Sequence, residues 1–164
     1  MILGFATQLK GKPTYFVEKI HSGLLQNDLL HGFDIGFEHS FDIDVLAECE
    51  PKLHTIREDK NDRWKAGTKI DFFINCRQPT MFRFAPVLPV VSVQEIEIKW
   101  IGFNTGFRPC IWIDKKLIYD VAGIKEELML ELAKNDGFDT VEDFFRYFDK
   151  DFKGKLIHWT DLKY

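Results

Sequence analysis

The sequence predicts a single α+β domain, and we expect its strands to form a small mixed barrel flanked by about three helices. Three observations support this fold class. The chain has 164 residues, a length typical of one domain. Aromatic residues make up 15% of it, including 16 Phe, which favours strands and a well-filled core. Segments with apolar residues at every second position outnumber those with helical periodicity, an order that indicates an α+β protein.

The N-terminal third is predicted to begin with a short strand at 1–7, where the residues are mostly apolar. Pro13 precedes a predicted helix at 14–25, because proline is favoured at the start of helices. The apolar face of this helix consists of Phe16, Val17, Ile20 and Leu24. Residues 26–50 are acidic and contain alternating Phe and Ile, and we interpret them as an insertion with its own hairpin or short helix.

The middle of the chain is predicted to form strands and turns. A turn is predicted at 61–67, and the alternation of residues 68–77 predicts a strand. Segment 81–103 contains Pro86 and Pro89 and then a period-two apolar run. This pattern predicts one strand that is interrupted by a bulge.

The C-terminal part is predicted to contain a strand pair at 108–118, helices at 123–134 and 141–152, and a final strand at 153–164. The strand pair turns at Asp114-Lys115. The first helix ends at Asn135-Asp136-Gly137, since glycine adopts the left-handed conformation that stops helices. Asp139 or Thr140 is expected to cap the second helix, whose first turn is acidic.

Charge is distributed unevenly along a chain whose net charge is -4. Residues 1–51 carry a net charge of -5, residues 52–85 of +4 and residues 86–164 of -3. The middle segment is therefore the candidate for an anion-facing surface. The alternative is a solvated strand face, because acidic residues lie among the basic ones. These are Glu58, Asp59 and Asp62.

Two neighbouring segments, KLHTIRED at 52–59 and DRWKAG at 62–67, resemble the signature of ASCH domains. ASCH domains belong to the PUA-like superfamily, whose small β-barrels are associated with RNA and modified nucleotides. The resemblance also covers FVEKIHSGL, VSVQEIEI and DGFDTVEDFFRYF…GKLIHWTDL, which is most of the chain outside 26–50. It implies one PUA-like domain over residues 1–164.

The first function that this resemblance implies is binding of RNA or of a modified nucleoside or nucleotide, in a pocket around K-x-H-T-I-R. The expected ligand-binding residues are Lys52, His54, Thr55, Arg57, Arg63, Trp64 and Lys65. Arg57 stays charged and suits a phosphate or a carbonyl oxygen. Trp64 either stacks on a base or packs under the turn. The negative net charge favours a small ligand or short RNA over a long duplex.

The second function is amide hydrolysis. Some small bacterial ASCH proteins remove the acyl group from acetylated cytidine with a lysine and a threonine of K-x-x-T-I-R and a later glutamate. By this resemblance the catalytic residues are Lys52, Thr55 and Asp136, the last an aspartate where the family has glutamate. A hydroxyl nucleophile needs a neutral amine beside it, which Lys52 provides if burial lowers its pKa. Asp136 would orient that amine.

Geometry sets a condition on this catalytic set. Residues 52 and 55 of a regular strand point to opposite faces, so Lys52 and Thr55 converge only if the chain turns just after Pro51. The alternatives are structural: a solvated Lys52, an ordinary strand Thr55 and an Asp136 that completes a turn. A third function, ribonuclease, would depend on Lys52, His54 and Tyr15.

No cofactor and no metal are expected. The spacing of four polar residues in the insertion matches no standard metal site; they are His31, Asp34, Glu38 and His39. The three cysteines lie too far apart for a zinc site and are interpreted as thiols in a reducing cytosol; they are Cys49, Cys76 and Cys110. No apolar run approaches the ~20 residues that cross a bilayer, and no secretory signal is apparent. We therefore expect a cytoplasmic protein with no membrane partner.

Overall fold

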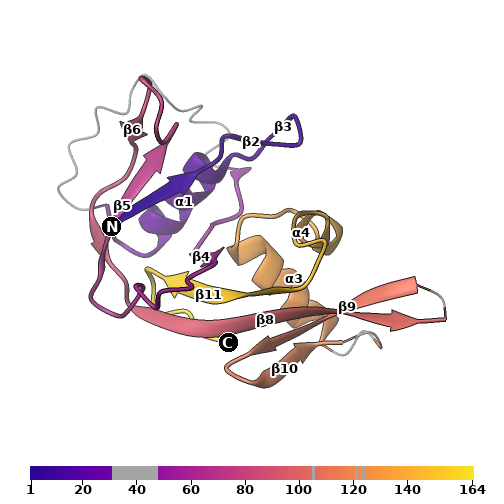
Figure 1. The fold of residues 1–164 in the computed structure, drawn as a ribbon. Coiled ribbons are helices and arrows are strands. Elements are labelled where there is room, and N and C mark those ends of the chain that lie inside the picture. Colours follow the sequence, from indigo (N-terminus) through magenta and orange to yellow (C-terminus); the bar gives the residue numbers. More distant parts are fainter. Residues whose placement is uncertain (31–47, 105, 121, 123–124) are drawn as a thin grey trace.

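The computed structural model describes residues 1–30, 48–104, 106–120, 122 and 125–164. In this part of the chain, eleven strands and three helices form two main sheets and one small hairpin (Figure 1). The α+β class predicted from the sequence is confirmed. The strands described do not close into a barrel, because each sheet keeps its own pair of edge strands.

The first sheet has four strands and is built around β5. Strand β1 pairs with β5 in parallel, whereas the two short strands that follow β5 pair with it antiparallel. The strands are β1 (Ile2–Phe5), β5 (Lys69–Ile74), β6 (Phe82–Arg83) and β7 (Leu88–Pro89). Beside this sheet, β2 (Gln8–Leu9) and β3 (Lys12–Pro13) form the small hairpin.

The second sheet has five antiparallel strands in the order β10-β9-β8-β11-β4. They are β4 (His54–Arg57), β8 (Ser92–Phe103), β9 (Gly106–Ile113), β10 (Lys116–Tyr119) and β11 (Phe152–His158). The predicted turn between β9 and β10 is confirmed. Asp114 and Lys115 both have positive φ, as a tight hairpin turn of this type requires.

The three helices are α1 (Phe16–Gln26), α3 (Glu126–Asn135) and α4 (Val141–Tyr147). Each lies within a predicted helical segment, to within one or two residues, but α4 ends five residues early. Trp100 explains this end: its ring nitrogen donates to the Phe148 carbonyl, and its backbone N–H donates to Asp151. These contacts hold residues 148–151 outside the helix.

Segment 81–103 differs from the prediction of one bulged strand, because it contributes β6, β7 and β8 to two different sheets. Val90 N donates to Thr68 in the first sheet, and Val91 N donates to His158 in the second. The chain therefore leaves one sheet and enters the other between these two residues. The insertion predicted at 26–50 falls largely on residues 31–47, which lie outside the described part of the chain.

The apolar core consists of two clusters, one beside each sheet. The first joins α1 to β1 and β5 and includes Ile20, Leu24, Phe72 and Trp159. The second lies between the five-stranded sheet and helices α3 and α4, and includes Ile98, Leu132 and Phe144. The start of β4 and the α3–α4 connection bring the two regions together, and the candidate site lies at this junction.

Candidate functional site

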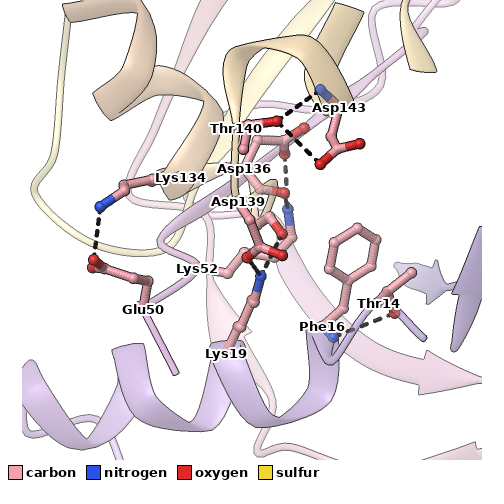
Figure 2. Close-up of polar contacts among 11 residues, drawn as sticks. Thr14, Phe16, Lys19, Glu50, Lys52, Lys134, Asp136, Asp139, Thr140 and Asp143 are labelled. Atoms are coloured by element: carbon pink, nitrogen blue, oxygen red, sulfur yellow. Dashed lines mark hydrogen bonds and ion pairs between the residues drawn. The ribbon is translucent and has the colours of Figure 1, made fainter. Parts of the chain in front are cut away.

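Lys52 and Asp136 form a buried ion pair at the junction, although they are 84 residues apart in sequence. Their exposed fractions are 1% and 4%. Lys52 Nζ lies 2.8 Å from Asp136 Oδ1 and also donates to the Asp136 carbonyl oxygen. Asp136 Oδ1 in turn accepts from the Ile56 backbone N–H at 3.1 Å. The structure thus brings together two of the three residues predicted to be catalytic (Figure 2).

The backbone positions this pair by fixing the chain just before β4. Lys52 N donates to the Lys19 carbonyl on α1, and Leu53 N donates to the Asn135 carbonyl at the end of α3. Lys19 makes the same kinds of contact as Lys52: its Nζ donates to a backbone carbonyl, that of Gly137, at 2.9 Å, and it forms an ion pair with a carboxylate, that of Asp139. Two lysines therefore meet the C-terminal end of α3, where the helix dipole favours positive charge.

Burial is the largest influence on both partners. It lowers the pKa of Lys52 to about 8, against the opposing attraction of Asp136 and with smaller contributions from Arg57 and Lys19. Burial also raises the pKa of Asp136, against the attraction of Lys52 and Arg57 and the hydrogen bond from Ile56. At mildly alkaline pH a substantial fraction of Lys52 therefore carries a neutral amine, which is the form that a general base requires.

His54 lies on the other side of Asp136 and is fully buried. Its Nδ1 is 3.8 Å from Asp136 Oδ1, and its Nε2 is 2.9 Å from the Tyr164 hydroxyl. That hydroxyl also accepts from Asn135 Nδ2 at 3.0 Å. His54 thus connects Asp136 to Tyr164. Burial, together with the charges of His158 and Lys52, holds the pKa of His54 well below its ordinary value.

An open cleft of about 380 Å³ lies beside this buried pair. Its walls come from the β2–β3 hairpin, the start of α1, the α3–α4 connection and α4. They carry three aromatic rings, those of Phe16, Phe138 and Tyr147. The charged lining residues are balanced in number: Lys10, Lys12 and Arg146 against Asp139, Asp143 and Asp149.

Phe16 and Gly137 link the cleft to the ion pair, because both line the cleft and both touch Lys52. Lys52 Nζ lies 4.9 Å from the centroid of the Phe16 ring. Gly137 has a φ of +91°, and a Cβ at this position would lie 3.0 Å from Lys52 Cδ and 2.8 Å from Phe16 Cε1. Phe16 and Gly137 therefore lie next to both the cleft and the lysine of the ion pair.

Thr55 is not joined to the pair. Strand β4 begins at His54, two residues after Lys52, so residues 52–57 are not one straight strand. Lys52 nevertheless reaches Asp136, while Thr55 lies in β4 opposite Ile157 of β11. The buried Thr55 side chain makes no hydrogen bond with the described residues. The predicted Lys52–Thr55 dyad is thus not seen as a contact.

The other predicted binding residues do not line the cleft. Arg57 donates to the Gly4 carbonyl at 2.8 Å and lies over the Phe5 ring, which is a structural role. Trp64 is 6% exposed and belongs to the first core cluster, so it packs under the turn. Arg63 and Lys65 are exposed beside it, and Lys65 pairs with Asp62.

The cleft is not the pocket predicted around K-x-H-T-I-R, which stays a prediction. Lys52, His54 and Thr55 are buried and do not line the cleft. The residues that do line the cleft lie mainly before the motif, at 9–16, and after α3, at 137–149. Sequence reasoning placed Phe16 on a core face and missed Phe138 and Tyr147. The signal available was the density of aromatic residues after Gly137.

Further predictions concern metals and membranes. The described residues contain no group of three or more His, Cys, Asp or Glu that is placed to hold a metal ion. The residues considered for a metal in the insertion, namely His31, Asp34, Glu38 and His39, lie outside the described part of the chain. Among the helices described, none combines the length and the apolar character needed to cross a membrane.

Compared with models of protein families, with curated proteins and with solved structures, the chain matches none.

Proposed function

We propose that this chain is a PUA-like ASCH domain that binds a modified nucleoside or nucleotide, or the end of a short RNA, in the aromatic cleft. The observation that carries the proposal is the cleft itself, whose Phe16–Gly137 floor touches the buried Lys52. Its volume of about 380 Å³ falls within the range of small-molecule sites. The sequence resemblance supplies the ligand class.

The lining of the cleft suits a base and a sugar. Tyr147 is 46% exposed and offers a ring on which a planar base can stack, with Phe16 as a second lining ring. Phe138 is 8% exposed and packs against both of these rings. The side chains of Lys12 and Asp149 make no hydrogen bond or ion pair with the described residues. These two side chains are thus free to bind polar groups of a ligand.

A second candidate function, favoured by the Lys52–Asp136 contact, is hydrolysis of the acyl group of acetylated cytidine. Lys52, with its pKa lowered to about 8, would accept a proton from water or the Thr55 hydroxyl as the oxygen attacks the amide carbonyl carbon. The same proton would then pass to the departing exocyclic amine. If water attacks, the acyl group leaves as a carboxylic acid; if Thr55 attacks, the acyl group is held as an ester until water hydrolyses it. Rotation of the Phe16 ring would open the path from the cleft to Lys52 Nζ.

A ribonuclease function has less support than the other two. A phosphodiester in the cleft would reach Lys52 only past the Phe16 ring, and His54 is buried and does not line the cleft. Tyr15, the third residue of that prediction, lines another hollow of about 180 Å³.

Calorimetric titration tests the binding proposal. We would titrate the protein with cytidine, acetylated cytidine and its 5′-monophosphate, and compare Tyr147→Ala with Arg63→Ala. Removing the Tyr147 ring should weaken binding roughly tenfold, as expected for loss of one stacking contact of 1–3 kcal/mol. Arg63→Ala, at a distance from the cleft lining, should bind normally. Equal effects of the two variants, or no binding by the wild type, would reject the cleft as the site.

Turnover tests the second candidate separately. Loss of the acyl group changes the ultraviolet absorbance of cytidine, so it can be followed directly. We expect turnover by the wild type and none by Lys52→Met, provided that the variant still binds ligand. Binding without turnover in the wild type would leave the protein a binding domain.

A further inference from the structure

The Tyr164 hydroxyl determines which nitrogen of His54 carries the proton. Asn135 Nδ2 donates to this hydroxyl, so an oxygen lone pair is already occupied. The hydroxyl proton then has one described acceptor within reach, His54 Nε2 at 2.9 Å. With Asn135 already donating to its oxygen, Tyr164 can donate its own proton to Nε2. In that arrangement a neutral His54 carries its own proton on Nδ1.

The protonated Nδ1 faces the Asp136 carboxylate. Nδ1 makes no hydrogen bond with the described residues, and Asp136 Oδ1 lies 3.8 Å away. This distance exceeds that of a hydrogen bond, but an N–H at Nδ1 would still attract a carboxylate in a site where His54 and Asp136 are both buried. Oδ1 thus faces three donors, which are Lys52 Nζ, the Ile56 N–H and His54 Nδ1.

His54 is held in this position from its remaining sides. His158 lies opposite it in β11, with ring centroids 5.2 Å apart, and the Tyr164 ring packs at 5.5 Å. The titratable groups that face His54 are therefore Asp136, Lys52, His158 and Tyr164. Burial lowers the pKa of His158 to about 4, so both histidines are neutral at physiological pH.

We infer that His54 is a positioning residue: as a neutral imidazole with its proton on Nδ1, it holds the Asp136 carboxylate against Lys52. This role differs from the ligand-binding role predicted for His54. A contribution of His54 to catalysis rests on the second proposed function, hydrolysis of acetylated cytidine, but the contact of His54 with Asp136 does not depend on any ligand. Failure of the positioning role can therefore be told apart from failure of the hydrolase proposal, because the measurements of the positioning role involve no turnover.

The first measurement is the tautomer of His54, obtained from long-range ¹H–¹⁵N spectra of the labelled protein between pH 5 and 8. We expect a neutral ring with the proton on Nδ1 throughout this range. Tyr164→Phe removes the hydroxyl donor and should allow the Nε2-protonated form to appear. A wild-type ring that is protonated on Nε2, or that becomes an imidazolium within this range, would overturn the inference.

The second measurement uses a matched pair of variants. In His54→Asn the side-chain amide occupies the place of Nδ1, whereas in His54→Gln it reaches the place of Nε2. If His54 supports the carboxylate through Nδ1, the Gln variant should lower the acid dissociation constant of Asp136 about tenfold, which is one pKa unit. The Asn variant should stay within threefold, as followed by ¹³C titration. Equal shifts would contradict a role for Nδ1, and the wild-type tautomer decides the matter if neither variant folds.

Discussion

Lys52 and Asp136 are both shielded from water, so removing one charge leaves the other without a partner. We expect Lys52→Met, which keeps most of the side-chain volume, to lower the free energy of unfolding at pH 7 by about 3–5 kcal/mol. The double variant Lys52→Met/Asp136→Leu should recover most of this loss, because it leaves no unpaired charge. Urea denaturation measures both. A single-variant loss below about 1 kcal/mol would show that the pair is not buried in solution.

The same lysine makes stability depend on pH. Its pKa is 10.5 in the unfolded chain and about 8 in the folded protein, so between these values the unfolded state binds more protons. Stability from this group therefore rises with pH across this window, by at most about 3 kcal/mol. Other groups titrate there too, so the quantity to measure is the difference between wild type and Lys52→Met. A difference that does not change from pH 7.5 to 10 would contradict the lowered pKa.

The role of a single residue could be predicted where the resemblance named that residue. It could not be predicted where the role depends on whether the side chain is buried. The resemblance paired Lys52 with Asp136, and the structure places them in contact. Burial of Trp64 and His54 depends on side chains far along the chain, such as Tyr164, which is 110 residues from His54. Periodicity within a short strand carries no information about such distant partners.

At the scale of elements, the N-terminus of α4 depends on one hydroxyl. Thr140 Oγ1 accepts from the Asp143 backbone N–H at 3.1 Å. Thr140→Ala should therefore cost about 1 kcal/mol of stability, whereas Thr140→Ser, which keeps the hydroxyl, should cost much less. Thermal unfolding distinguishes the two. Because α4 forms one wall of the cleft, the Ala variant should also bind cleft ligands more weakly than the Ser variant.

The α3–α4 connection depends on Gly137 in two ways, through its positive φ and through its contacts. A Cβ there would lie within about 3 Å of Phe16 and Lys52. Gly137→Ala should lower stability by about 3 kcal/mol, from backbone strain and overpacking together. Gly67 is a matched control, since its φ is +83° but its added Cβ would meet no described atom within 4 Å. If both substitutions lower the free energy of unfolding equally, the close approach to Phe16 and Lys52 contributes nothing to the loss of stability.

The ends of helices and strands could be predicted where residues at the end itself favour a turn or a helix stop. The turn at Asp114-Lys115 and the stop after Asn135 follow from local backbone preferences, and both are present. Segment 81–103 was predicted as one strand because alternation reports a half-buried strand without saying which sheet it joins. The early end of α4 depends on Trp100, a residue of β8, so helical propensity alone overestimates its length.

At the scale of the whole molecule, composition and element order predicted the α+β class but not how the sheets associate. The parallel pairing of β1 with β5 joins segments about 70 residues apart, and the order β8-β11-β4 joins the end of the chain to its middle. Such pairings depend on the complete set of strands and helices. The cleft arises from them, since its lining comes from both ends of the chain.

At the scale of the whole molecule, the charge predicts how binding depends on salt, and this dependence distinguishes a nucleoside site from an extended RNA-binding surface. The net charge is -4, and the cleft lining carries three basic and three acidic side chains, so little phosphate neutralisation is available. Each phosphate contact with single-stranded RNA should weaken binding roughly 2.6-fold between 50 and 200 mM salt. We therefore expect the affinity for a nucleoside to change less than twofold over this range, and an oligoribonucleotide to lose no more than one such factor. Calorimetry at the two salt concentrations measures this. A loss of tenfold or more for the oligonucleotide would place RNA on a basic surface outside the cleft, for which Arg63 and Lys65 are the exposed candidates.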